Sequence, residues 1–111
     1  MEYLAGPYSH VEPAIVALRY ECHRQCAAEL IKRGRVIYSP IVHGHNLLPE
    51  LAHWRHREWL DYDLKILAKC SSVIVLMLDG WLESKGVKEE LEFARERGLP
   101  VLHLNEGEYP L

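Results

Sequence analysis

The segment that decides the fold of this chain is SVIVLML, residues 72–78, which Asp79 and Gly80 close. Its apolar character is nearly unbroken, and it lacks the alternation of a strand that exposes one face to water. A strand of this kind is typically buried on both faces, as in the middle of a parallel sheet. We therefore expect a central strand here, with the other elements arranged around it.

Two short strands and a long helix are expected on the N-terminal side. The strands are the apolar run Glu2–Ala5 and the segment Val36–Tyr38. Between them a helix is expected from Pro13, a residue suited to the first turn, to the stop at Gly34. Its apolar side chains recur at spacings of three and four, and this inward stripe comprises Ile15, Leu18, Cys22, Cys26 and Leu30.

The remaining elements lie around the central strand. An irregular loop around His43 and Pro49 is expected after the second strand, before a helix over Trp54–Lys69. A further helix over Ser84–Arg97 follows the central strand, and Pro100–Leu104 is the last strand. The predicted order is therefore β-α-β-α-β-α-β.

This order predicts an α/β fold of the Rossmann/flavodoxin-like type. We expect a small doubly wound parallel sheet of about four to five strands, with helices on both faces and right-handed crossovers. The chain has 111 residues, of which 49% are hydrophobic and 26% charged. This length suffices for one core and not for two, so residues 1–111 are expected to form a single domain.

Charge and composition narrow the range of partners. The net charge is -3, so no clustered basic face is indicated that would bind nucleic acid, and a small-molecule partner fits better. Neither a signal sequence nor a run of about 18 apolar residues is present, which predicts no membrane partner and a cytoplasmic location. The three cysteines lack a CxxC pair, as is typical of reduced cytoplasmic thiols.

Two carboxylates are expected at the carboxyl edge of the sheet. Asp63 interrupts the otherwise apolar face of the helix Trp54–Lys69, and Glu90 lies at the margin of the inward stripe of the helix Ser84–Arg97. A buried carboxylate is costly, so Asp63 has either a functional role or a structural tie to a backbone group or an arginine. Two carboxylates in one cleft can divide into an ionised nucleophile and a proton donor, which suits cleavage at an anomeric carbon.

Several neighbouring loops could hold the rest of a ligand. Ser84, Gly86 and Val87 open a helix, where free N–H groups and a hydroxyl suit a phosphate, although an ordinary serine cap is the alternative. The turn Gly6-Pro7-Tyr8 would allow close backbone approach and stacking of Tyr8 on a planar base, or it is a plain strand-end turn. Arg19 could reach a carboxylate or phosphate, or form a structural ion pair.

A histidine-rich and aromatic stretch leaves several alternatives open. The four histidines His43, His45, His53 and His56 suggest a metal site. They do not form an HExxH motif, however, and no acidic residue is clearly placed as a third ligand, so we expect no metal. The aromatic residues Trp54, Trp59 and Tyr62 could belong to the core, to a stacking wall for a base or to a subunit contact.

Two motifs resemble those of nucleoside 2-deoxyribosyltransferase-like proteins. The segment YLAGPY, residues 3–8, resembles the opening of that superfamily, and Ser84-x-Gly86-Val87-x-x-Glu90-Leu91-x-x-Ala94 resembles its catalytic helix. Asp63 matches an aspartate before the central strand, and GLPV, residues 98–101, is similar to the Gly-x-Pro-Val of the superfamily. The resemblance runs through most of the chain.

The resemblance implies an activity for the two carboxylates. Glu90 would attack C1′ of a sugar and form a glycosyl-enzyme, with assistance from Asp63, in a retaining transfer or hydrolysis at an N-glycosidic bond. Ser84 replaces the usual aspartate of the transferases and is more similar to the deoxynucleoside 5′-monophosphate N-hydrolase branch. The implied partner is therefore a nucleotide or nucleoside, bound by Gly6, Pro7, Tyr8, Arg19, His43, His45, Ser84, Gly86 and Val87.

The resemblance further implies no cofactor, no metal and a homodimer or higher homo-oligomer. Trp81 and the segment His43-Gly44-His45 are similar to an uncharacterised subgroup of the superfamily. Two alternatives remain open for the function. One is a nucleotide-binding sensor without turnover, and the other is a histidine-based metal hydrolase.

Overall fold

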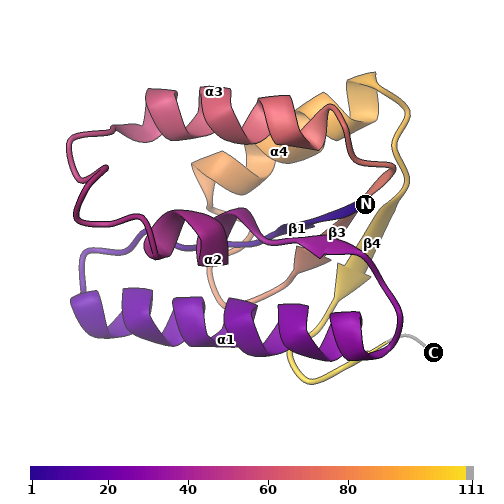
Figure 1. Ribbon diagram of the computed structural model, residues 1–111, viewed down its shortest axis with the longest axis horizontal. Helices are drawn as coiled ribbons and strands as arrows, with labels where there is room; N and C mark the ends of the chain where they lie inside the picture. The colour runs from indigo at the N-terminus through magenta and orange to yellow at the C-terminus, as the bar shows by residue number, and fades with distance from the viewer. Residues whose placement is uncertain (110–111) are drawn as a thin grey trace.

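The computed structural model describes residues 1–109 and contains a four-stranded sheet in which every pairing is parallel (Figure 1). Its spatial order is β2-β1-β3-β4. The strands are β1 (Glu2–Ala5), β2 (Ile37–Tyr38), β3 (Ser72–Leu76) and β4 (Val101–Leu104). The expected α/β fold with a doubly wound parallel sheet is confirmed, and β3 is a central strand.

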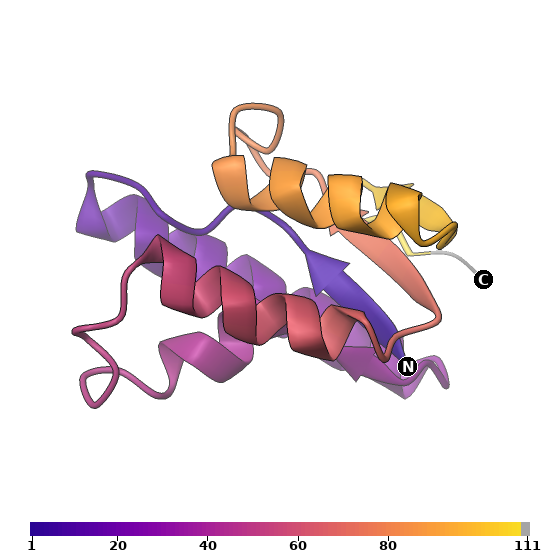
Figure 2. The same cartoon turned by 90° about the horizontal axis from the view of Figure 1, so that it is seen from above.

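Helices cover both faces of this sheet, as predicted. They are α1 (Pro13–Lys32), α2 (Pro40–His45), α3 (His56–Leu67) and α4 (Lys85–Glu96). Figure 1 shows α1 on one side of the strands, with α3 and α4 on the other. Figure 2 shows α3 and α4 side by side, as their mutual contacts require.

Alternate residues of β3 supply two separate cores. Val73 and Val75 pack with Tyr3 and Ala5 against α3 and α4, while Ile74 packs with Leu4 against α1. All of these side chains are fully buried. The unbroken apolar run in the sequence thus reflects a strand that has no solvent-facing side.

One helix of the structure is not predicted from the sequence. The segment Pro40–His45, expected as part of an irregular loop, forms helix α2. Ser39 caps it, because its Oγ accepts a hydrogen bond from the Val42 N–H at 3.2 Å, and Pro40 occupies the first turn. The helix is short enough that its apolar periodicity is hard to recognise.

The predicted inward stripe of α1 is partly wrong. Leu18 is 61% exposed, whereas His23 is fully buried. The buried side chains of α1 are those of His23, Cys26, Ala27 and Leu30. Hydropathy does not predict a buried histidine, but one nitrogen of the His23 ring has a partner. Nε2 lies 3.2 Å from the carbonyl oxygen of Pro7, whereas Nδ1 is buried without a partner among residues 1–109. Burial lowers the pKa of His23 to about 4, so the ring is neutral at pH 7 and Nε2–H donates to Pro7.

Gly6 is required by this buried histidine. A Cβ atom at position 6 would lie 2.5 Å from Cε1 and 2.8 Å from Nε2 of His23. The backbone after β1 can therefore lie on the imidazole ring only if residue 6 has no side chain.

None of the helices described between residues 1 and 109 is both long and apolar enough to cross a bilayer.

The contact between Gly6 and His23 generates a prediction about stability. Gly6→Ala should lower the free energy of unfolding by roughly 1–3 kcal/mol, because the added methyl group overpacks a fully buried site. Urea unfolding followed by circular dichroism measures this change. Gly86→Ala is the matched control, since an added Cβ meets no atom closer than 3.9 Å and the residue is helical. Equal stability of Gly6→Ala and the wild type would contradict the packing.

Candidate functional site

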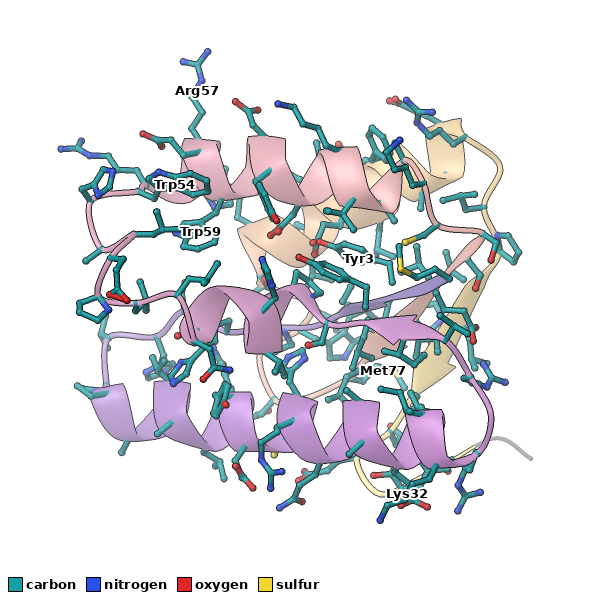
Figure 3. All side chains as sticks on the ribbon, in the orientation of Figure 1. Tyr3, Lys32, Trp54, Arg57, Trp59 and Met77 are labelled. Atoms are coloured by element: carbon teal, nitrogen blue, oxygen red, sulfur yellow. The ribbon has the colours of Figure 1, made fainter. Side chains whose placement is uncertain are left out.

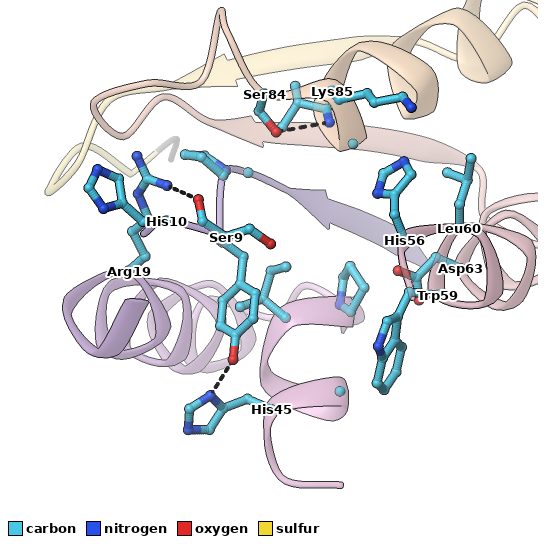
Figure 4. A pocket seen from close by; sticks show the side chains of 18 of the residues that line it. Ser9, His10, Arg19, His45, His56, Trp59, Leu60, Asp63, Ser84 and Lys85 are labelled. Atoms are coloured by element: carbon cyan, nitrogen blue, oxygen red, sulfur yellow. Dashed lines mark hydrogen bonds between the residues drawn. The ribbon is translucent and has the colours of Figure 1, made fainter. Parts of the chain in front are cut away.

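A cavity lies at the carboxyl edge of the sheet, between the ends of β1 and β3. The chain leaves β1 for β2 on one side and later returns to β3 on the other, so the strand order reverses between β1 and β3. Ligand crevices of open α/β sheets form at such switch points. The cavity has a volume of about 950 Å³, and residues of the loops after β1 and β3, α2, α3 and the first turns of α4 line it (Figure 4).

Glu90 forms part of the wall of this cavity although its side chain is almost completely buried. It is 7% exposed, on the face of α4 that also buries Val87 and Ala94. Its Oε2 accepts a hydrogen bond from the hydroxyl of Tyr3. Burial raises the pKa of Glu90 to about 8, against the opposing effect of the Tyr3 hydrogen bond, and the negative charge of Asp63 raises it further.

Tyr3 is the site residue that the sequence analysis did not identify as functional. It is fully buried in β1, and Figure 3 shows its side chain between the sheet and the helices α3 and α4. A tyrosine in a buried strand normally finds a partner for its hydroxyl, and this rule was the available signal. The partner itself, 87 residues away in sequence, follows only from the fold.

Asp63 lines the same cavity from α3. Burial raises the pKa of Asp63 to about 7. The sequence left open a tie to an arginine, but none of the ion pairs formed within residues 1–109 involves this carboxylate. Asp63 and Glu90 are therefore two carboxyl groups that share one cavity and affect each other's charge.

The first turn of α4 lines the cavity on the side opposite to His45 (Figure 4). Ser84 caps helix α4, because its Oγ accepts a hydrogen bond from the Val87 N–H at 3.2 Å. A Cβ added at Gly86 would make only ordinary van der Waals contacts, with His56 Cε1 at 3.9 Å and Ser84 Oγ at 4.0 Å. The backbone of this turn is thus accessible to a ligand.

Arg19 holds together the two loops that bound the cavity. Its Nη1 donates to the carbonyl oxygen of Ser9 at 2.7 Å (Figure 4). Its Nη2 donates to the carbonyl oxygen of Asp79 at 2.9 Å. Neither of the roles considered from the sequence, an ion pair or direct binding of an anion, describes these contacts. Arg19 therefore connects the loops after β1 and β3.

The histidines of the central segment have separate partners. His45 lines the cavity, lies 2.7 Å from the Tyr8 hydroxyl through Nδ1 and stacks on Tyr20 with ring centroids 3.8 Å apart. His43 lies outside the cavity lining and contacts Tyr62. His56 pairs with Glu89 at 2.9 Å. Within the described part of the chain, no three His, Cys, Asp or Glu side chains are grouped so that they could hold a metal ion.

Neither Trp54 nor Trp59 belongs to the buried core, which was one of the three roles that the sequence left open. Trp54 and Trp59 line the cavity, and the centroids of their rings lie 4.8 Å apart. Figure 3 labels both residues near the start of α3. Trp59 also packs on α2, because an added Cβ at Gly44 would lie 3.1 Å from its ring. Tyr62 is not among the residues that line the cavity.

Most of the predicted site residues therefore meet at one place. Both predicted catalytic residues line the cavity, and of the predicted binding residues only His43 does not. The binding residues that line it are Gly6, Pro7, Tyr8, Arg19, His45, Ser84, Gly86 and Val87.

The raised pKa values of the two carboxyl groups predict a pH-dependent stability. Both groups hold protons in the folded state well above their ordinary pKa values of 3.8 and 4.5. The free energy of unfolding should therefore fall as the pH rises above about 4, until the folded groups ionise near pH 7 and 8. Thermal unfolding across this range should show a flatter dependence in Glu90→Gln.

Glu92→Gln is the control for this series, because Glu92 is an exposed carboxyl on the same helix. Its pH dependence should match that of the wild type. An identical slope in Glu90→Gln and the wild type would contradict the burial of a protonated Glu90.

Comparison with known proteins gives a family but no activity. No curated protein matches the chain. The family model described as "Domain of unknown function (DUF1937)" matches residues 1–106, which include both carboxyl groups and every residue that lines the cavity. The chain therefore belongs to the DUF1937 family.

Proposed function

We propose that this protein cleaves the N-glycosidic bond of a deoxynucleoside or nucleoside 5′-monophosphate and transfers the sugar to water or to a second base. The observation that carries the proposal is the nearly buried carboxyl of Glu90. It accepts a hydrogen bond from the Tyr3 hydroxyl and lines a cavity together with Asp63. Paired carboxyl groups are the usual apparatus for substitution at an anomeric carbon.

The reactive form of the pair carries its single proton on Asp63 and its negative charge on Glu90. Because the pKa of Glu90 is about 8 and that of Asp63 about 7, this is the minority form of the singly protonated pair. In the first half of the reaction, the ionised Glu90 oxygen forms a bond to C1′ while the bond from C1′ to the base nitrogen breaks. The electron pair of that bond remains on the base, which takes up the proton of Asp63. The Tyr3 hydroxyl donates to Oε2 of Glu90, which favours the carboxylate and fixes its orientation. The product is a glycosyl-enzyme ester and a free base.

In the second half, water or another base attacks C1′ and the ester bond to Glu90 breaks. Asp63, now ionised, accepts the proton of the attacking group. The sugar is thus substituted twice at the same carbon, and its configuration is retained. Both carboxyl groups return to their initial protonation states.

The size and lining of the cavity support a nucleotide-sized substrate. Its volume of about 950 Å³ lies toward the upper end of the range usual for small-molecule sites. The N–H groups at the start of α4 suit the 5′-phosphate, because Gly86 in this turn has no side chain that would cover them. On the opposite side, Tyr8, His45 and Trp59 provide aromatic and polar surfaces for the base.

The remaining implications of the resemblance stay predictions. We propose that the activity needs no metal or cofactor and that the protein acts in the cytoplasm as a homodimer or larger homo-oligomer. Size-exclusion chromatography combined with light scattering measures the oligomeric state directly.

Base release in a Glu90 variant tests the proposed reaction. The purified protein is incubated with deoxynucleoside and ribonucleoside 5′-monophosphates and with the corresponding nucleosides, and free base is followed by chromatography. We expect release from at least one monophosphate, faster than from its nucleoside, and a loss of roughly 10³-fold or more in Glu90→Gln, which has no nucleophile. Glu92→Gln should retain the wild-type rate.

Two further observations sharpen this test. Gly86→Ala should weaken the preference for monophosphates, because its methyl group would lie beside the N–H groups of the first turn of α4, where the phosphate is proposed to bind. Stoichiometric binding of a nucleotide without base release, unchanged in Glu90→Gln, would contradict catalysis and favour a nucleotide-binding sensor.

The pH profile of kcat/KM provides a separate prediction. The reaction needs one carboxylate and one protonated carboxyl, so the rate should rise as the pair loses its first proton and fall as it loses the second. With folded pKa values of about 7 and about 8, the profile should be bell-shaped with its maximum between them. In Asp63→Asn the rate should be lower by roughly 10²-fold and the falling limb should be lost, because amide protons do not replace the acid. A falling limb that persists in Asp63→Asn would contradict this role.

A further inference from the structure

His56 lines the cavity, yet the proposed reaction assigns it no role. It is the first residue of α3. The residues that α3 contributes to the cavity are His56, Trp59, Leu60 and Asp63, and these spacings of three, four and seven place them on one face of the helix. Figure 4 shows His56, Trp59 and Asp63 on the side of α3 that faces the cavity. His56 lies about 10 Å along the helix axis from Asp63, at the start of this face.

The first turn of α4 occupies the corresponding position on the neighbouring helix. Gly86 and Glu90 both line the cavity and are one turn apart, about 6 Å along the axis. Cε1 of His56 lies 3.9 Å from the position that a Cβ of Gly86 would occupy. The imidazole ring therefore lies beside the first turn of α4, whereas the carboxyl groups of Asp63 and Glu90 lie one to two turns further along the two helices.

Glu89 holds the imidazole ring of His56 through one nitrogen. Nε2 of His56 lies 2.9 Å from Oε1 of Glu89. An ionised carboxyl group only accepts hydrogen bonds, so Nε2 carries a proton and donates it to this contact. In the protonated ring Nδ1 carries a second N–H, which can donate to a ligand. The His56 side chain is 47% exposed, so a ligand can reach the ring.

The charges around this end of the cavity favour an anion. Arg55 and Lys85 line the cavity beside the starts of α3 and α4, and neither takes part in the ion pairs formed within residues 1–109. Asp79 and Glu83 line it from the loop after β3 and oppose this effect. The basic groups, including a protonated His56, outnumber these two acidic groups, and the helix dipole of α4 adds positive potential at its first turn.

We infer that His56 selects a phosphorylated substrate: its Nδ1–H donates a hydrogen bond to the 5′-phosphate, while Glu89 accepts from Nε2–H and orients the ring. The inference deepens the proposed function and rests on it for the identity of the ligand. The phosphate would lie between His56 and the N–H groups at the start of α4, with C1′ of the sugar between Glu90 and Asp63. Glu89 is then a positioning residue, because it acts through His56.

Binding of 2-deoxyribose 5-phosphate tests the inference without turnover, because this compound has no N-glycosidic bond. In isothermal titration calorimetry, His56→Gln should weaken its binding by roughly tenfold, since a charge-assisted hydrogen bond to the phosphate is lost. His53→Gln is the matched control, because His53 is exposed and does not line the cavity, and it should bind as the wild type does. Equal affinity of His56→Gln and the wild type, or no binding by the wild type, would overturn the inference.

Two further measurements keep the inference testable if His56→Gln does not fold. Nitrogen NMR of the wild-type protein should show a shift of the His56 ring signals when 2-deoxyribose 5-phosphate is added, whereas the His53 signals should not move. Glu89→Gln should weaken binding by a smaller factor, because the ring remains but loses its orienting partner. Unmoved His56 signals, or a loss of binding in Lys85→Gln alone, would overturn the inference.

The activity assay separates this inference from the proposed reaction. If bases are released, His56→Gln should raise KM for the monophosphate by roughly tenfold with kcat held within about twofold, because the phosphate contact is made in the ground state and the transition state alike. The KM for the nucleoside should not change. If no base is released but sugar phosphate binding depends on His56, the phosphate contact stands and the proposed reaction fails. Base release with undiminished sugar phosphate binding in His56→Gln gives the opposite result.

Discussion

Both faces of β3 are kept from water, and this constraint determines where everything else lies. Ile74 and Leu76 need a partner on one side of the sheet, which α1 provides, and Val73 and Val75 need one on the other, which α3 and α4 provide. Parallel strands can be joined only by crossovers, so helices must lie on these faces. Since the chain winds first to one side of β1 and then to the other, the crevice between β1 and β3 follows from the burial of the central strand.

The apolar layer that stabilises the sheet also controls the chemistry of the carboxyl groups. Glu90 extends from α4 into the layer that contains Val87 and Ala94, and the desolvation that results keeps its proton attached. The hydroxyl of Tyr3, supplied by the strand below, opposes this effect and favours the charged form. The balance of the two effects leaves the pKa of Glu90 at about 8, so this proposed nucleophile is not permanently ionised at neutral pH. Burial of Glu90 among these apolar side chains and its hydrogen bond with Tyr3 therefore act on the pKa of its carboxyl in opposite directions.

The sequence contains the alternation of elements and the two acidic interruptions of apolar stripes, so the fold and the positions of Asp63 and Glu90 could be predicted. Periodicity could not distinguish Leu18 from His23 on α1, because a histidine that is buried through one carbonyl contact has no signature in hydropathy. Helix α2 could not be predicted because its six residues are too few to show a helical periodicity. The role of Tyr3 could not be predicted because its hydrogen-bond partner, Glu90, lies on the last helix. His43 and His45 are two residues apart, yet only His45 lines the cavity; that difference arises from the turn of α2.

Two loops that bound the cavity are connected through the side chain of Arg19. The guanidinium group bridges the backbone of two loops that are far apart in sequence, and it lies so close to Gly80 that a Cβ there would come within 2.7 Å of Nη2. The distance between the loop after β1 and the loop after β3 is thus set by one guanidinium group, which contacts the backbone of both loops. The spacing of these two loops therefore depends on a residue of α1, whereas the two carboxyl groups are carried by α3 and α4.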